Sequence, residues 1–164
     1  MSDHRAIAHY IIHVVGHVNV LQVQTLLEGL APQTRQQLIK HRSKRGMTAL
    51  RRAASRDRVE VAKELIKSAD SEDREFVINC VDDDNRTPLY WAKSSAMVQT
   101  LLEGLTPQTR QQLIKHTDRA GQTAAEAALI THRELFNIIW TQSDLFTKLS
   151  LLQSTSDDGT SLLM

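Results

Sequence analysis

The stretch VQTLLEGLAPQTRQQLIKH at residues 23–41 recurs at residues 98–116 as VQTLLEGLTPQTRQQLIKH. The two copies differ only in Ala31 against Thr106, and they lie 75 residues apart. An identity of this length indicates internal duplication, and copies at a fixed spacing are the sequence sign of a repeat architecture. Because 75 residues are too many for one small repeat, a shorter unit is expected within the duplicated segment.

A tight turn followed by a helix start marks that shorter unit. It occurs at spacings of 39, 36 and 38 residues, as Gly46-Met47-Thr48, Asn85-Arg86-Thr87, Gly121-Gln122-Thr123 and Gly159-Thr160-Ser161. A serine or aspartate stands three residues before each, namely Ser43, Asp82, Asp118 and Ser156. A short acceptor followed by a residue that tolerates left-handed backbone favours such a turn. The threonine is expected to cap the helix that follows, and Pro88 suits its first position.

Two apolar stretches of helical character follow each turn. The first are TALRRAA (48–54), TPLYWAK (87–93) and TAAEAAL (123–129), and the second are RVEVAKELI (58–66), AMVQTLLEGL (96–105) and RELFNIIW (133–140). A short helix pair cannot bury its apolar face alone, so neighbouring pairs must stack. This succession resembles the ankyrin repeat, with its pattern D-x-x-G-x-T-P-L-H-x-A-A, a short turn and a second helix ending in leucines.

The units are longer than the usual ankyrin repeat of about 33 residues, and the added residues predict a third short helix. Twelve residues before each turn acceptor stand Ala31, Asp70, Thr106 and Asp144, three of which are good N-caps. Eight before it stand the cations Arg35, Arg74, Arg110 and Lys148. Five and four before it stand Leu38-Ile39, Val77-Ile78, Leu113-Ile114 and Leu151-Leu152. We expect the apolar pair to pack on the stack and the stem of the cation to cover its edge.

The sequence therefore predicts an all-α solenoid of ankyrin type, formed as one domain over residues 1–164, with three helices in each repeat. Repeats are expected at about 4–42, 43–81, 82–117 and 118–155, with a partial fifth at 156–164. The first should be atypical, as terminal repeats are. The apolar ending Leu162-Leu163-Met164 either caps the stack in a short form or continues into a longer protein, and the second interpretation is favoured.

The composition is that of an ordinary globular domain, with 41% hydrophobic residues, 24% charged residues and a net charge of +1. This balance implies no general attraction to nucleic acid or to an anionic membrane. No apolar run approaches the roughly 20 residues that span a bilayer. The single cysteine, Cys80, favours a reducing compartment. We therefore expect a cytoplasmic monomer, located in a host cell if the chain is a secreted effector.

Charge is distributed unevenly along the chain. Residues 40–67 hold ten basic and three acidic side chains, whereas residues 70–84 hold seven acidic side chains and only Arg74 as a basic one. The favoured interpretation is a solvated surface on which the two blocks partly neutralise each other. The alternatives are a site for an acidic protein and, less favoured, for a nucleic acid or phosphoinositide. No aromatic residue lies within 40–67 to stack on nucleic-acid bases.

The sequence gives little support for a metal site or a catalytic site. His9, His13 and His17 share the four-residue spacing of a helix face, but Gly16 is expected at a turn that separates His17 from the others. The chain has no phosphate-binding glycine loop, no G-x-S-x-G and no H-E-x-x-H. The sequence therefore predicts a protein without catalytic activity, metal or cofactor.

The resemblance implies that a partner is bound by the turn tips and the exposed side of the first helices, on the concave face. By register the tips are Lys44, Arg45, Met47, Asp83, Asp84, Arg86, Arg119 and Gln122, and the adjoining helix positions are Arg51, Arg52, Tyr90, Trp91 and Glu126. The histidine of the ankyrin pattern is replaced by Arg51, Tyr90 or Glu126. Its usual hydrogen bonds between repeats are thus in doubt, and these positions could be free for contacts.

Tyr90 and Trp91 are the most informative of these residues, because tyrosine, tryptophan and arginine dominate interface energetics. Packing of Trp91 between repeats is the favoured alternative. The predicted function is binding of another protein. The alternative is a targeting or substrate-recruiting segment of a larger secreted effector or enzyme, since the L-x-P-x-x-R-x-x-L-I spacing is similar to ankyrin proteins of intracellular bacteria, which act inside host cells.

Overall fold

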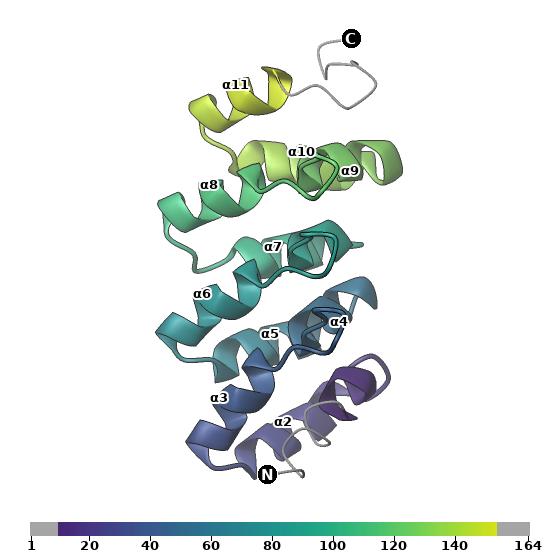
Figure 1. Cartoon of the computed structure of the whole chain (residues 1–164), viewed down its shortest axis with the longest axis vertical. Coiled ribbons are helices and arrows are strands. Elements are labelled where there is room, and N and C mark those ends of the chain that lie inside the picture. The colour runs from purple at the N-terminus through teal and green to yellow at the C-terminus, as the bar shows by residue number, and fades with distance from the viewer. Residues whose placement is uncertain (1–9, 154–164) are drawn as a thin grey trace.

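The computed structural model describes residues 10–153, except for the side chains of Glu72, Ile130, Thr131 and Gln153. Over this range the chain is helical, and its helices stack along one long axis (Figure 1). The predicted all-α solenoid is confirmed. The partial repeat expected at 156–164 and the apolar ending of the chain lie outside the described residues. No helix between residues 10 and 153 is long and apolar enough to cross a membrane.

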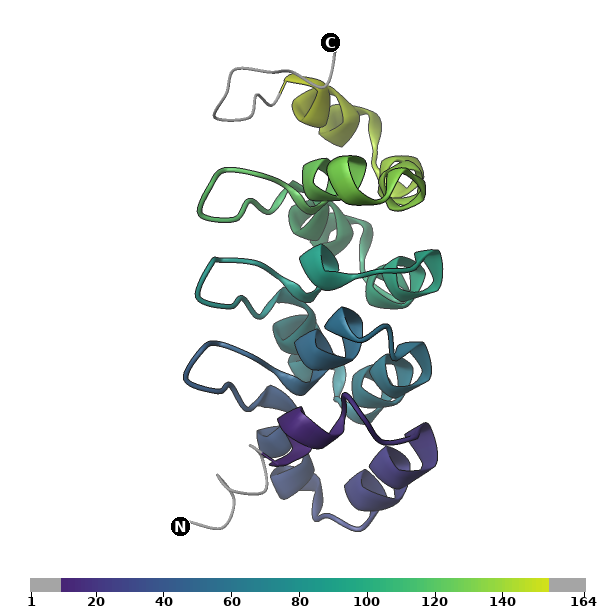
Figure 2. The same cartoon turned by 90° about the vertical axis from the view of Figure 1, so that its right-hand side faces the viewer.

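Equivalent helices form three columns, and the turns at 42–47, 81–86 and 117–122 project from one edge of the stack (Figures 1 and 2). The first helices are residues 10–14, α4 (Ala49–Ser55), η1 (Pro88–Trp91) and α9 (Ala124–Thr131). The second helices are α2 (Val20–Glu28), α5 (Val59–Ser68), α7 (Ser95–Leu102) and α10 (Arg133–Gln142). The third helices are α3 (Pro32–Lys40), α6 (Ser71–Asn79), α8 (Pro107–Lys115) and α11 (Leu145–Gln153).

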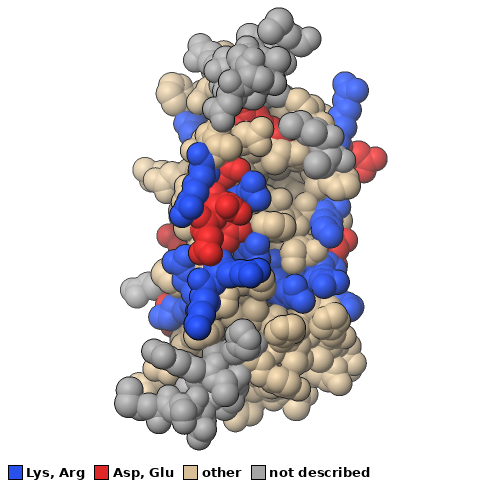
Figure 3. All heavy atoms as spheres, turned by 45° about the vertical axis from the view of Figure 1, so that its right-hand side comes forward, with Lys and Arg blue, Asp and Glu red and all other residues tan. Residues whose placement is uncertain are grey.

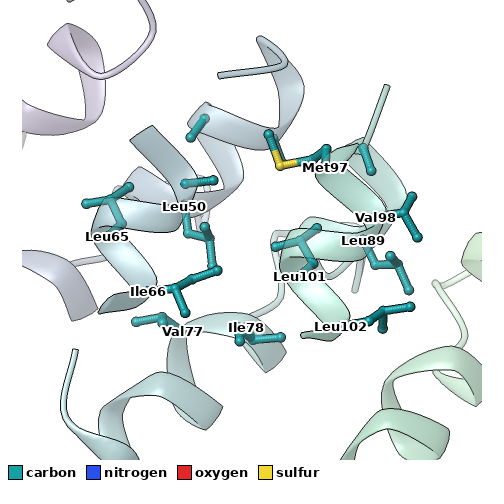
Figure 4. Close-up of a cluster of buried hydrophobic side chains, with 14 of the residues drawn as sticks. Leu50, Leu65, Ile66, Val77, Ile78, Leu89, Met97, Val98, Leu101 and Leu102 are labelled. Atoms are coloured by element: carbon teal, nitrogen blue, oxygen red, sulfur yellow. The ribbon is translucent and has the colours of Figure 1, made fainter. Parts of the chain in front are cut away.

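The core runs along the whole stack, between neighbouring units as well as within them. Leu50 and Ile66 of one unit face Leu101 of the next, and Val77 and Ile78 of α6 close the lower edge of the cluster (Figure 4). All five side chains are at most 7% exposed. The stacking that the short apolar helices required is therefore achieved by burying each unit against its neighbours.

The third helix forms in every described unit, as predicted. Its expected caps are present, because Asp70, Thr106 and Asp144 each accept a hydrogen bond from the backbone N–H three residues later. The apolar pairs are buried to 2% exposure or less, except for half-buried Leu152. Side-chain caps thus fix where these helices begin, and the apolar pair fixes which side packs.

Three of the four cations of the third helices contact a second helix, which belongs to the same unit for Arg35 and Lys148 and to the next unit for Arg110. Arg35 donates from Nε to the carbonyl of Leu27 at 2.8 Å, which satisfies an acceptor at the end of α2. Arg110 donates to the side chain of Gln142 at 3.2 Å. The Lys148 ammonium lies 5.7 Å from the Trp140 ring centroid. These contacts support a structural role for the column.

Substitutions in α8 separate the contributions of the apolar pair and the cation. We expect Leu113→Ala to lower the free energy of unfolding by about 2–5 kcal/mol, because it leaves a cavity in the core. Arg110→Gln, at a half-buried rim position, should cost less than about 1 kcal/mol. Urea denaturation monitored by circular dichroism measures both. A larger loss for Arg110→Gln would contradict this division of roles.

The first helix of the third unit is shorter than predicted. α5 begins eleven residues after Thr48, whereas α7 begins eight residues after Thr87. The three missing residues account for the shorter spacing of 36 residues, and they remove the second turn of the helix. The helix expected over 87–93 is therefore wrong beyond Trp91, where the backbone of Ala92 becomes extended.

The predicted threonine caps are confirmed at Thr48 and Thr123 but wrong at Thr87. The hydroxyls of Thr48 and Thr123 each accept from the backbone N–H three residues later. In η1 the corresponding N–H, that of Tyr90, donates instead to the Thr87 carbonyl at 3.1 Å. This is the tighter hydrogen bonding of a 3₁₀ helix, and it leaves the buried Thr87 hydroxyl without a hydrogen-bond partner.

Isosteric substitution tests this difference. We expect Thr123→Val to cost about 1 kcal/mol of stability through the lost cap. Thr87→Val should be neutral or stabilising, because it removes a buried hydroxyl that makes no hydrogen bond. Unfolding midpoints of the two variants in urea provide the comparison. Equal destabilisation by both would show that the Thr87 hydroxyl also caps its helix.

Candidate protein-interaction surface

One side of the stack is formed by the projecting turns and the first helices, and Figure 2 turns this side toward the viewer. In α4, Ala49, Leu50, Ala53 and Ala54 are buried against the second helices, so the arginines between them lie on the outer side. We call this side the first-helix face. It contains the following residues: Lys44, Arg45, Met47, Arg52, Arg56, Asp83, Asp84, Arg86, Tyr90, Trp91, Lys93, Arg119, Gln122 and Ala127.

The turns have the predicted conformation. Oδ1 of Asp82 accepts from the backbone N–H groups of Asp84 and Arg86, at 2.9 and 3.0 Å. The carboxylate of Asp118 repeats this arrangement one unit later. Gly46 has φ of +67°, and a Cβ there would lie 2.8 Å from the Asp82 backbone. The close approach of successive turns therefore requires glycine at this position.

Asp82 also joins its turn to the preceding unit. Its Oδ2 accepts from Nε of Arg51 at 3.0 Å and from the indole N–H of Trp91 at 3.1 Å. The Arg51 guanidinium lies 4.1 Å from the centroid of the Trp91 ring, a cation–π contact. The Asp82 side chain is only 3% exposed, so a single buried carboxylate holds three elements together.

A second set of contacts joins the third and fourth units. Arg86 donates from Nε to Asp118 Oδ2 at 3.2 Å. The Tyr90 hydroxyl lies within hydrogen-bonding distance of the carbonyls of His116 and Gln122, at 2.6 and 2.5 Å. Burial, aided by the negative charge of Asp118, raises the pKa of Tyr90 above its ordinary value. The phenol therefore stays protonated and acts as a donor.

The positions that replace the pattern histidine are occupied by contacts within the chain. Arg51 pairs with Asp82, the Tyr90 hydroxyl lies between two backbone carbonyls that can accept its proton, and Glu126 accepts from the Thr123 N–H at 2.6 Å. Glu126 is 8% exposed. The expectation that these three positions are free is therefore wrong, because other side chains rebuild the bonds between and within repeats. Their role toward a partner stays a prediction.

Several predicted residues remain accessible on the first-helix face. The tip residues Lys44, Arg45, Asp83, Asp84 and Arg119 are exposed, and Met47, Arg52, Arg86, Trp91 and Gln122 are half-buried. Figure 3 shows basic side chains running across this side of the molecule beneath a compact acidic cluster. The expected neutralisation between the charge blocks occurs in part, through the ion pairs Lys40–Asp73 and Arg51–Asp82.

Some basic groups of this face stay unneutralised. Among residues 10–153, no ion pair involves Lys44, Arg45, Arg52, Arg56 or Lys93. The predicted partner-binding residues include Lys44, Arg45 and Arg52 but not Arg56 and Lys93, which follow the ends of α4 and η1. Both positions could have been found from the repeat alignment, since each lies just beyond a first helix.

A pocket of about 170 Å³ opens on this face between η1 and α9. Its wall includes Trp91 and Arg86 from the third unit and Ala127 from the fourth. No sequence motif predicts this pocket. The irregular spacing of 36 residues between the second and third turns was the only available indication.

The family model described as ankyrin repeats, in three copies, matches residues 9–111. The chain belongs to the ankyrin repeat family. Ankyrin repeats generally act as protein–protein interaction modules and are typically non-catalytic. A search of curated proteins found no match. The match ends within α8, but α9, α10 and α11 continue the same three-helix arrangement.

The carboxylate that joins the ankyrin units can be tested against its neighbour in the same turn. We expect Asp82→Asn to lower the free energy of unfolding by about 1.5–3 kcal/mol, the scale of hydrogen bonds to a charged group. Asp83→Asn, at an exposed position, should change it by no more than about 0.5 kcal/mol. Denaturant unfolding gives both values. Similar effects of the two substitutions would mean that Asp82 does not hold the units together.

Proposed function

We propose that this ankyrin-repeat chain is a non-catalytic module that binds another protein through its first-helix face. The observation that carries the proposal is the combination on this face of half-buried Trp91 with Arg52 and Arg56, which form no ion pair among residues 10–153. Tryptophan, tyrosine and arginine are the residues in which binding energy concentrates at protein interfaces. Trp91 is held in place by Asp82 and Arg51, so little conformational freedom would be lost on binding.

The one cysteine of the chain supports binding rather than chemistry. Cys80 is 6% exposed, and burial raises the pKa of its thiol above the ordinary value. Since the thiolate is the nucleophilic form, this group is poorly suited to covalent catalysis. A free buried thiol also suits the reducing conditions of the cytoplasm, where we place the protein.

Charge reversal on the first-helix face tests the proposed function. The variant Arg52→Glu, Arg56→Glu is chosen because neither side chain forms an ion pair, whereas reversal of Arg51 would break its bond to Asp82. A control, Lys63→Glu, Lys67→Glu, makes the same change of charge on the second helix of the same unit and breaks only the exposed Lys63–Glu60 ion pair, which contributes little to stability. Both variants should retain the helical content and the unfolding midpoint of the parent.

We expect proteins captured from lysate by the parent to be reduced about tenfold or more by the first-helix-face variant. The control should capture them within about twofold of the parent. Quantitative mass spectrometry of the bound fraction measures both effects. Equal capture by the two variants, or selective loss in the control, would place binding on another surface and contradict the proposal.

A further inference from the structure

The pocket between η1 and α9 combines an apolar floor with a polar and aromatic rim. The floor is formed by Leu89, Val98 and Leu135, each no more than 4% exposed. Trp91 and Ala127, both half-buried, border it on the first-helix face. The pocket is therefore a depression of the binding face that reaches the hydrophobic core.

The missing turn of the third unit explains why the pocket exists. In the second unit, Ala53 and Ala54 in the second turn of α4 are completely buried. η1 ends at Trp91, before a corresponding turn could form. The residues that face this gap from α9 include Ala127 and Ala128, whose small side chains do not fill it.

The size and lining of the pocket suit a large apolar side chain. A cavity of about 150 Å³ lined by leucine, isoleucine and phenylalanine admits benzene, and this pocket has a volume of about 170 Å³. Ligand sites are usually apolar depressions with a few polar groups at the rim, and this one has the size of a single side chain rather than of a whole small-molecule ligand. A leucine or phenylalanine inserted there would bury itself against the core and against the Trp91 ring.

The charges around the pocket indicate what flanks such a side chain. Arg86 at the rim is already paired with Asp118. Lys93 follows η1, and Arg52 and Arg56 lie in the adjacent unit; none of these three forms an ion pair among the described residues. Negative charge would therefore favour a segment that passes these three cations rather than the exposed acids Asp83 and Asp84 at the turn tip.

We propose that the first-helix face binds an acidic segment of a partner protein, with one large apolar residue of that segment inserted into the pocket between η1 and α9. This proposal rests on the proposed function and specifies its partner class. Neighbouring units lie about one helix diameter, roughly 10 Å, apart, and an extended chain covers about 3.3–3.6 Å per residue. Acidic residues are therefore expected about three positions from the apolar one.

A single-stranded nucleic acid fits these features less well. Bases stack on aromatic faces, but one face of Trp91 is already covered by Arg51 at 4.1 Å. A floor of leucine and valine offers no partner for the polar edges of a base. A peptide side chain is the occupant that the lining favours.

Panning a phage library of random linear peptides on the 164-residue chain tests the proposal. We expect enriched sequences that carry leucine or phenylalanine with aspartate or glutamate about three positions away. A synthetic fluorescent copy of the most enriched peptide then serves as the probe for fluorescence anisotropy. Ala127→Phe, which places a ring at the pocket mouth, should weaken its binding about tenfold or more.

Matched measurements keep the two proposals separable. The variant Arg52→Glu, Arg56→Glu should weaken peptide binding about tenfold or more. The control Lys63→Glu, Lys67→Glu should bind the peptide within about twofold of the parent. Replacing the apolar anchor of the peptide by alanine should abolish the effect of Ala127→Phe. Circular dichroism and unfolding midpoints verify that each variant is folded.

Three results would overturn the pocket proposal while leaving the first-helix face as the binding surface: unchanged binding to folded Ala127→Phe, enriched peptides without a large apolar residue, or enriched peptides without acidic residues. If a fluorescent oligothymidine bound as tightly as the peptide or more tightly, the ligand class would be nucleic acid rather than an acidic peptide. A library without binders would also overturn the pocket proposal. If only the control variant Lys63→Glu, Lys67→Glu lost peptide binding, the result would instead contradict the proposed function itself.

Discussion

No unit of this solenoid can bury its own apolar surface, so each depends on its neighbours. Leu50 of one unit and Leu101 of the next are at most 1% exposed because the two units meet. Burying one such side chain contributes about 1.5–3 kcal/mol, and stability in repeat arrays is approximately a sum over these interfaces. The third helix enlarges each interface, because Val77 and Ile78 lie at its lower edge. The polar groups must therefore be accommodated at the margins of the stack.

At the margin formed by the turns, local conformation and stacking depend on the same groups. One oxygen of Asp82 fixes its own turn through two backbone N–H groups, and the other accepts from Arg51 of the preceding unit. Asp118 is bonded in the same way: one oxygen accepts from backbone N–H groups of its own turn, and the other accepts from Arg86 of the preceding unit. A turn that changed its conformation would thus also lose its bond to the neighbouring unit. This coupling positions the tip residues that border the first-helix face.

Features set by residues close in sequence could be predicted, and those set by distant residues could not. The caps at Asp70 and Thr106 and the burial of Leu113 follow from spacings within one helix. The capping box of Thr123 and Glu126 was also visible as T-x-x-E, although the register of the resemblance assigned Glu126 to the surface. The contact of Asp82 with Arg51 joins residues 31 positions apart, and no local pattern indicates which arginine reaches which carboxylate.

The missing turn of η1 connects the irregular spacing of the sequence with the shape of the binding face. Removing a helical turn costs contacts, yet Leu89 remains buried and Trp91 gains the indole bond to Asp82 and the stacked Arg51. The tryptophan thus replaces lost packing on one side while it borders the pocket on the other. Packing between repeats and contact with a partner are therefore compatible roles for Trp91. A residue fixed by the fold is also a rigid anchor, which lowers the entropy lost on association.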